Sequence, residues 1–181
     1  MGTFSDLLHQ DGEDNIAGMA QGHYIAPWDK INNFPRTNGG TADGDSVVWN
    51  TGIWGFETGE CFTRLYSTLD SAEVQDKMVG EADGKSYETT FEFTYPGSKK
   101  EALEAVSEWK NRGCVIIAVE ANGQKRVIGN PLFRATLKDG SFKSGKKTSD
   151  GKKTTIIFET RGLTPAPILD DSVNIPITPA S

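Results

Sequence analysis

The residue types that carry most enzyme chemistry are few in this chain and are poorly spaced for it. The histidines His9 and His23 lie in a stretch interrupted by Gly and Pro, and no HExxH motif or zinc-ligand cluster surrounds them. The cysteines Cys61 and Cys114 lie inside apolar, strand-like segments without CxxC spacing, which favours buried free thiols over a disulfide or a metal site. We therefore expect no catalytic residue, no metal and no cofactor.

Two further patterns suggest chemistry but do not meet its requirements. Glu88 and Glu92 could form a glycosidase-like carboxylate pair, but residues four apart on a strand are separated by about 13 Å. Such chemistry uses roughly 5–10 Å. The sequence Gly84-Lys85-Ser86 resembles the end of a P-loop, but Val79 stands where the motif requires its first glycine. We interpret the glutamates as part of an exposed acidic strand face.

That strand gives the clearest structural signal in the chain. Residues 87–95 alternate with period two, which predicts a strand with one buried face and one wet face. The aromatic face holds Tyr87, Thr89, Phe91, Phe93 and Tyr95, and the polar face holds Glu88, Thr90, Glu92 and Thr94. Further strands are predicted at residues 46–50, 61–67, 114–120, 124–128, 132–138 and 153–161, and residues 74–79 are either a strand or a short helix.

One segment changes to a helical period. Residues 99–112 carry an apolar stripe that includes Val106 and Trp109, with Ser98 and Glu101 spaced as a capping box and Gly113 as a stop. The predicted fold is thus mainly β (α+β), an antiparallel β-sandwich or barrel with one flanking α-helix. A core at residues 46–162 lies between two extended arms.

The arms are rich in apolar residues without a regular pattern. We expect the irregular N-terminal arm (1–45), the Pro-rich C-terminal arm (163–181), or both to lie across neighbouring copies, with Ile168, Leu169 and Ile175 as inter-subunit contacts. No apolar run approaches the roughly 20 residues of a membrane span. The first residues also lack a signal peptide's basic start and apolar stretch, so we expect no membrane partner and no export.

The charges are unevenly distributed along the chain. Residues 1–97 carry a net charge of −11 and residues 98–162 a net charge of +7, within an overall charge of −6. The two halves either mix in space, or the basic half binds an anion such as nucleic acid, or a basic surface of one copy meets an acidic surface of the next. We interpret the Gly/Ser-rich loop at 139–153 as solvated or partner-facing, and in the third case its lysines are the proposed inter-subunit contacts: Lys146, Lys147, Lys152 and Lys153.

The order of elements resembles the tail tube fold of bacteriophages and contractile injection machines. Residues 119–129 (VEANGQKRVIG) and 145–159 (GKKTSDGKKTTIIFE) resemble tail proteins from phages of Bacteroides-like hosts, and the similarity covers about residues 85–167. The resemblance implies a virion protein of the tail, assembled in the host cytoplasm with other phage tail proteins. It also implies hexameric, stacked rings around a channel through which DNA passes without specific contacts, and it supplies no catalytic residue.

A DNA channel needs a wall that is negative or neutral, because a basic wall would bind the phosphates. We therefore expect Glu88, Thr90, Glu92 and Thr94 to face the channel and the loop lysines to lie at ring contacts, although the two glutamates could instead face outer solvent. A tail terminator or connector ring protein of the same fold is an alternative. From another class, a carbohydrate-binding β-sandwich could use exposed Trp28, Trp49 and Trp54 as stacking platforms.

Overall fold

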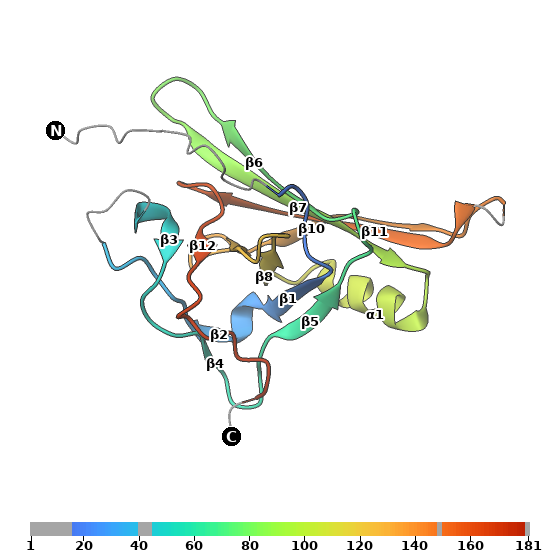
Figure 1. The fold of residues 1–181 in the computed structure, drawn as a ribbon, viewed down its shortest axis with the longest axis horizontal. Helices are drawn as coiled ribbons and strands as arrows, with labels where there is room; N and C mark the ends of the chain where they lie inside the picture. Colours follow the sequence, from blue (N-terminus) through green and yellow to red (C-terminus); the bar gives the residue numbers. More distant parts are fainter. Residues whose placement is uncertain (1–15, 40–44, 148–149, 180–181) are drawn as a thin grey trace.

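A computed structural model describes residues 16–39, 45–147 and 150–179. The protein is mainly β, with two large sheets packed face to face and one α-helix beside them (Figure 1). The six-stranded sheet has the order β3-β12-β9-β8-β1-β5, the four-stranded sheet has the order β10-β11-β7-β6, and β2 and β4 form a small third sheet. All strand pairs are antiparallel except β12 with β3. This confirms the predicted sandwich with a flanking helix.

The four-stranded sheet is built around the strand with the strictest alternation. β7 (Ser86–Pro96) lies between β6 (Glu73–Val79) and β11 (Lys153–Gly162), and β10 (Thr136–Lys143) forms the far edge. Phe91 and Phe93 are fully buried on the inner face, as the period-two pattern predicted. The ambiguous residues 74–79 are a strand. The β10–β11 hairpin extends beyond the body of the sandwich (Figure 1).

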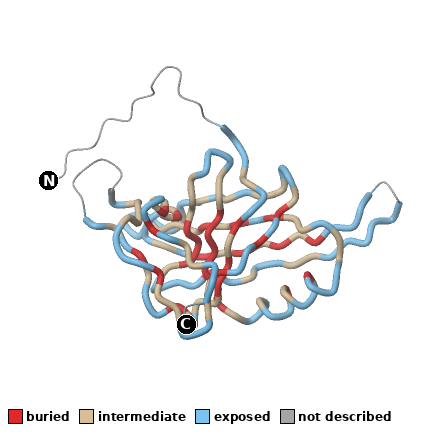
Figure 2. The backbone as a smooth tube through the Cα atoms, turned by 60° about the horizontal axis from the view of Figure 1, so that its bottom comes forward, coloured by how far each residue is buried: buried red, intermediate tan, exposed pale blue. Residues whose placement is uncertain are grey.

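The six-stranded sheet lies between two hydrophobic cores. Its strands are β1 (Gly22–Pro27), β3 (Val48–Trp49), β5 (Thr63–Tyr66), β8 (Cys114–Val119), β9 (Lys125–Ile128) and β12 (Ile168–Leu169). In β8, Ile116 and Ala118 face the core shared with the four-stranded sheet, whereas Val115 and Ile117 face a second core. Burial on both faces explains why this strand is an uninterrupted apolar run. The buried residues gather at the centre of the molecule (Figure 2).

Aromatic side chains dominate the second core. They come from β1 and β3, from the short elements η1 (Trp28–Lys30) and β4 (Gly55–Phe56), and from the loops beside them. The neighbouring short elements β2 (Ile31–Asn33) and η2 (Asp45–Val47) hold no aromatic residue, and β2 contributes Ile31 to this core. Trp54 packs edge-on against Phe62, with ring centroids 5.0 Å apart, and tilted against Phe34 and Trp49. Such clusters bury a large apolar area with few residues.

The helix α1 spans Lys100–Trp109, somewhat shorter than predicted. Val106 is buried, and the half-buried Trp109 packs on Phe158 with ring centroids 5.7 Å apart. The capping prediction was wrong, because the N-cap is Lys99 and no side chain caps the helix there. For Ser98 to be the N-cap, the helix would have to begin at Lys99. After the Pro96-Gly97 turn, in which Gly97 has a positive φ, the helix instead begins one residue later, at Lys100.

The two arms need the largest correction. β1 is an interior strand of the six-stranded sheet, so the prediction of an irregular arm is wrong for residues 22–33. Residues 1–15 and 40–44 lie outside the described part of the chain. At the other end, β12 pairs with β9 and β3 of the same chain, and Leu169 and Val173 are buried in the second core. The glycines and prolines that suggested arms mark the turns between these short strands.

The structure also changes the predicted bounds of the strand at 132–138 and of the loop that follows it. Leu132 and Phe133 belong to a turn and are exposed, and β10 begins only at Thr136, although Ala135 bridges to Cys114. β10 then continues to Lys143, so the loop expected at 139–153 is only the hairpin tip from residue 144 to residue 152. Pairing along β11 extends β10 despite its Gly-containing sequence, because a hairpin partner supplies the ladder hydrogen bonds.

Candidate functional site

The outer face of the four-stranded sheet carries the polar residues of β7, and we call it the outer sheet face. Glu92 is exposed on it, and Glu88, Thr90 and Thr94 are half-buried between neighbouring strands. These side chains point away from the buried Phe91, as the alternation predicted. Residues paired across strands share a face, so the pairing register identifies their neighbours.

One row of side chains crosses the outer sheet face through Glu92. Its partner on β6 is Glu73, and Ile157 of β11 and Asp139 of β10 continue the row on the other side. Carboxylates directly opposite each other repel. Within the described ranges, none of the three carboxylates has an ion-pair partner. The row is therefore a line of unneutralised negative charge across the middle of the sheet.

A second row combines both signs of charge. Glu88 lies between Lys77 of β6 and Arg161 of β11 in the register. Lys138 Nζ lies 2.8 Å from Glu159 Oε2 and 3.9 Å from Glu88 Oε1. The hydrogen bond to Glu159 raises the pKa of Lys138 above its ordinary value, so this lysine stays charged and is neutralised locally. Basic groups on this part of the face thus lie beside carboxylates.

The hairpin tip carries the excess positive charge. Asp150 Oδ2 accepts the backbone N–H groups of Lys146 and Lys147, each at 3.0 Å, which fixes part of the turn. In the described part of the tip and its flanking strand ends, no lysine forms an ion pair. The exposed lysines are Lys143, Lys146, Lys147, Lys152 and Lys153. Their role in ring contacts remains a prediction.

The C-terminal residues predicted as inter-subunit contacts are used inside the chain. Leu169 is buried, and Ile168 pairs with Val48 and Arg126 in the six-stranded sheet. Ile175 packs against the second core. The assignment of Leu169 to a neighbouring copy is therefore wrong, and the other two residues also contact their own domain. The Pro-rich sequence correctly indicated an extended segment but not the surface to which it binds.

The tryptophans do not form an exposed stacking platform. Trp54 is 5% exposed, and Trp28 and Trp49 are half-buried against the same aromatic core. Trp28 donates its ring N–H to the carbonyl of Asn130 at 2.9 Å. The interpretation of these three residues as one exposed sugar-binding surface is therefore wrong, because Trp54 is buried and the other two pack against the same core.

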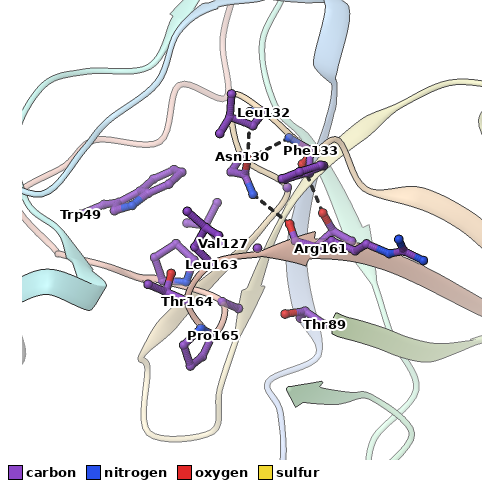
Figure 3. A pocket seen from close by; sticks show the side chains of 15 residues that line it. Trp49, Thr89, Val127, Asn130, Leu132, Phe133, Arg161, Leu163, Thr164 and Pro165 are labelled. Carbon is purple, nitrogen blue, oxygen red and sulfur yellow. Dashed lines mark hydrogen bonds between the residues drawn. The ribbon is translucent and has the colours of Figure 1, made fainter. Parts of the chain in front are cut away.

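A hollow that the sequence did not predict lies at the end of the sandwich near β3 (Figure 3). Asn130 holds its rim, because Oδ1 accepts the backbone N–H groups of Leu132 and Phe133 at 2.9 and 2.8 Å, and Nδ2 donates to the carbonyl of Arg161 at 3.1 Å. The side chains of Leu132 and Leu163 are each 78% exposed beside a cavity of about 160 Å³. The Asn130-Pro131 dipeptide was the turn signal that could have located this rim.

Burial holds His23 and Cys114 in their neutral forms. His23 Nδ1 accepts the N–H of Val119 at 3.0 Å, and Nε2 lies 3.1 Å from Ser67 Oγ. Burial lowers the pKa of His23 to about 4 and raises the pKa of Cys114 to about 12, so both groups are neutral at pH 7. Cys61 is half-buried, and both thiols are free, as predicted.

Among the described residues, no group of His, Cys, Asp or Glu side chains is placed to hold a metal ion. The described helices are also too short and too polar for any of them to cross a membrane. Comparison of the chain with protein-family models, with curated proteins and with solved structures finds no match.

Proposed function

We propose that this protein is a structural subunit of the bacteriophage tail tube type. Copies assemble into stacked, hexameric rings, and the outer sheet face lines a channel through which DNA passes. The observation that carries the proposal is the outer sheet face itself. It is a broad polar surface on a regular sheet, and the unneutralised carboxylate row of Glu73, Glu92 and Asp139 crosses its middle.

The charge pattern suits passage rather than binding of DNA. A wall that binds phosphates presents free lysines and arginines and binds more weakly as salt increases. On the outer sheet face Lys138 is held by Glu159, and Lys77 and Arg161 flank Glu88. The register also places Lys143 and Lys153 on this face, at the hairpin end and away from the carboxylate row. The carboxylate row repels the phosphates from the middle of the wall.

The hairpin tip supplies the opposite charge at one end of the same sheet. In the proposed assembly its lysines, Lys146, Lys147, Lys152 and Lys153, lie beyond the end of the channel wall and meet carboxylates of neighbouring copies, with Lys153 at the edge of the outer sheet face. Electrostatic attraction of this kind sets register and speeds association more than it adds affinity. It also accounts for the separation of charge between the two halves of the sequence.

A terminator or connector ring of the same design would also place a polar sheet around a channel. The two roles differ in stacking, because a tube subunit continues to add rings, whereas a terminator or connector stops after one. The length of the assembled particles therefore distinguishes them. A carbohydrate-binding role is disfavoured by the packing of the three tryptophans.

Negative-stain imaging of the purified protein tests the proposal. We expect rings or tubes with an open centre, and a monomer of 19.7 kDa at all concentrations would contradict it. The channel is tested with Glu92→Lys in combination with Glu73→Lys. Assembled particles of this variant should bind double-stranded DNA in low salt and release it in high salt. Glu104→Lys combined with Glu108→Lys, on the exposed side of α1, makes the same charge change away from the outer sheet face and should bind no DNA.

A further inference from the structure

An apolar groove runs between α1 and the edge strand β5. All four residues of β5 line it, together with Tyr95, Ala102, Ala105 and Trp109, around a volume of about 260 Å³. Successive strand residues point to opposite faces, so a groove that touches all four must follow the edge of the strand. We call it the α1–β5 groove.

β5 is a free edge of the six-stranded sheet, because within the described part of the chain it pairs with β1 alone. Natural proteins normally cover or charge such edges to prevent unwanted pairing. Here the flanking groove is apolar, and Tyr66 next to it is 47% exposed. A mostly apolar groove beside an uncovered edge is expected where another protein surface binds.

An apolar projection lies at the other end of the sandwich. It consists of Leu132, Phe133 and Leu163, which we call the Leu132 patch, and its two leucines are among the most exposed apolar residues of the protein. The Asn130 hydrogen bonds fix the turn that presents Leu132 and Phe133, so little conformational freedom is lost when they bind a partner. A rigid turn with exposed apolar side chains is suited to insertion into a groove.

The patch and the groove are separate surfaces of one molecule. Thr89, near one end of β7, lines the cavity beside the Leu132 patch, whereas Tyr95, near the other end, lines the α1–β5 groove. Six residues along a strand correspond to roughly 20 Å. A contact between a patch and a groove that lie this far apart is heterologous, and repeated contacts of this kind form a ring or a filament.

Charge complementarity supports the same pairing. Arg161 is exposed beside the Leu132 patch, and Glu101 is exposed on the helix wall of the groove. Neither side chain has an ion-pair partner in the described ranges. Arg64, on the strand wall, adds a positive charge to the groove, so Arg161 is expected on the helix side of the contact.

We propose that the Leu132 patch of one copy packs into the α1–β5 groove of the next, with Arg161 of the first copy beside Glu101 of the second. This contact is the lateral interface within a ring, and it rests on the proposed function. This proposal places the lateral interface at apolar residues, whereas the charge pattern of the sequence pointed only to the lysines of the hairpin tip.

Two variants remove the two halves of the contact separately. Leu132→Asp puts a charge on the patch, and Ala105→Glu fills the groove with a residue that is compatible with the helix. Each should weaken self-association at least about tenfold, as loss of a central apolar contact does. Ile53→Asp is the matched control, since Ile53 is 69% exposed but lines neither surface. It should assemble as the unmodified protein does.

Mixing the variants tests whether the contact is heterologous. Leu132→Asp retains an intact groove and Ala105→Glu an intact patch, so a mixture should form one-to-one dimers by analytical ultracentrifugation, while each variant alone stays monomeric. As a test that leaves the apolar residues unchanged, Arg161→Glu and Glu101→Lys should each weaken assembly and should restore it when combined in one chain. Circular dichroism spectra equal to that of the unmodified protein show that each variant is folded.

The outcomes separate this inference from the proposed function. Rings from the unmodified protein together with normal rings from Leu132→Asp and Ala105→Glu would overturn the inference and leave the proposed function intact. Assembly lost in both variants, without dimers on mixing, would also overturn it. An unmodified protein that stays monomeric would overturn both proposals.

Discussion

Asp76 on β6 and Arg126 on β9 form an ion pair that joins the two sheets of the sandwich. Both side chains are mostly buried, and Asp76 Oδ1 also accepts hydrogen bonds from Thr89 Oγ1 and from the backbone N–H of Ala166. Arg126 Nε donates to the carbonyl of Ala166 at 2.9 Å. The pair therefore connects both sheets to the segment that leads into β12.

The first prediction concerns this pair. Arg126→Ala should lower the free energy of unfolding by about 3 kcal/mol, because it leaves a mostly buried carboxylate without its charge partner. Lys125→Ala is the matched control, since its partner Asp171 is almost fully exposed, and it should cost under about 1 kcal/mol. Urea denaturation measures both, and equal losses would show that the inter-sheet pair has no special role.

The second prediction concerns pH. The folded protein holds His23 neutral with a pKa of about 4, below the ordinary value of 6.5, so the unfolded chain binds the proton first as the pH falls. The stability that neutral His23 contributes is complete above pH 6.5 and is lost between pH 6.5 and pH 4, by roughly 3 kcal/mol. Unfolding curves over this range should show the loss.

His23→Gln separates this effect from that of the carboxylates. Glutamine does not titrate, so the variant should be less stable at pH 7 but should lose less stability than the unmodified protein between pH 6.5 and pH 4. Parallel pH profiles for the two proteins would contradict the assignment to His23.

The third prediction concerns the helix. Trp109 is half-buried on Phe158, so Trp109→Ala should cost about 2–3 kcal/mol, less than the 3–5 kcal/mol of a fully buried tryptophan. Leu103→Ala on the exposed side of α1 should change stability by no more than about 0.5 kcal/mol. Chemical denaturation of the two variants tests this, and similar values would show that the helix packs differently.

The fourth prediction concerns the C-terminal segment. Because Leu169 and Val173 are buried in the second core, deletion of residues 163–181 should prevent stable folding rather than merely block assembly. Leu169→Ala should cost about 2–4 kcal/mol. A truncated protein with a cooperative unfolding transition at the original temperature would contradict the placement of β12.

Local patterns in the sequence were enough to predict the helix and the strands with a strong period. The period-two alternation of β7 identified both its buried aromatic side and the polar face that holds Glu88 and Glu92. The helical stripe through Val106 likewise located α1. In both segments a strong local period agrees with the tertiary packing, so the face of each residue could be assigned before any contact was known.

The remaining features depend on contacts between distant residues. β12 is only two residues long and exists because β9 and β3 lie on either side of it, which no local pattern in the Pro-rich segment indicates. Trp28 and Phe34 show no period because they pack on the second core from short, irregular segments. The pairing of Glu73 with Glu92 depends on strand register, and the sequence alone left even the nature of β6 undecided.

The central claim is that copies of this chain assemble into a ring whose channel is lined by the outer sheet face. Electron cryo-microscopy of the assembled, purified protein tests it most directly. We predict a ring in which Glu92 and Glu73 face the channel and Lys146, Lys147, Lys152 and Lys153 lie at contacts between copies. A ring with Glu92 on its outer wall, a channel lined by those lysines, or the absence of any ring would contradict the account.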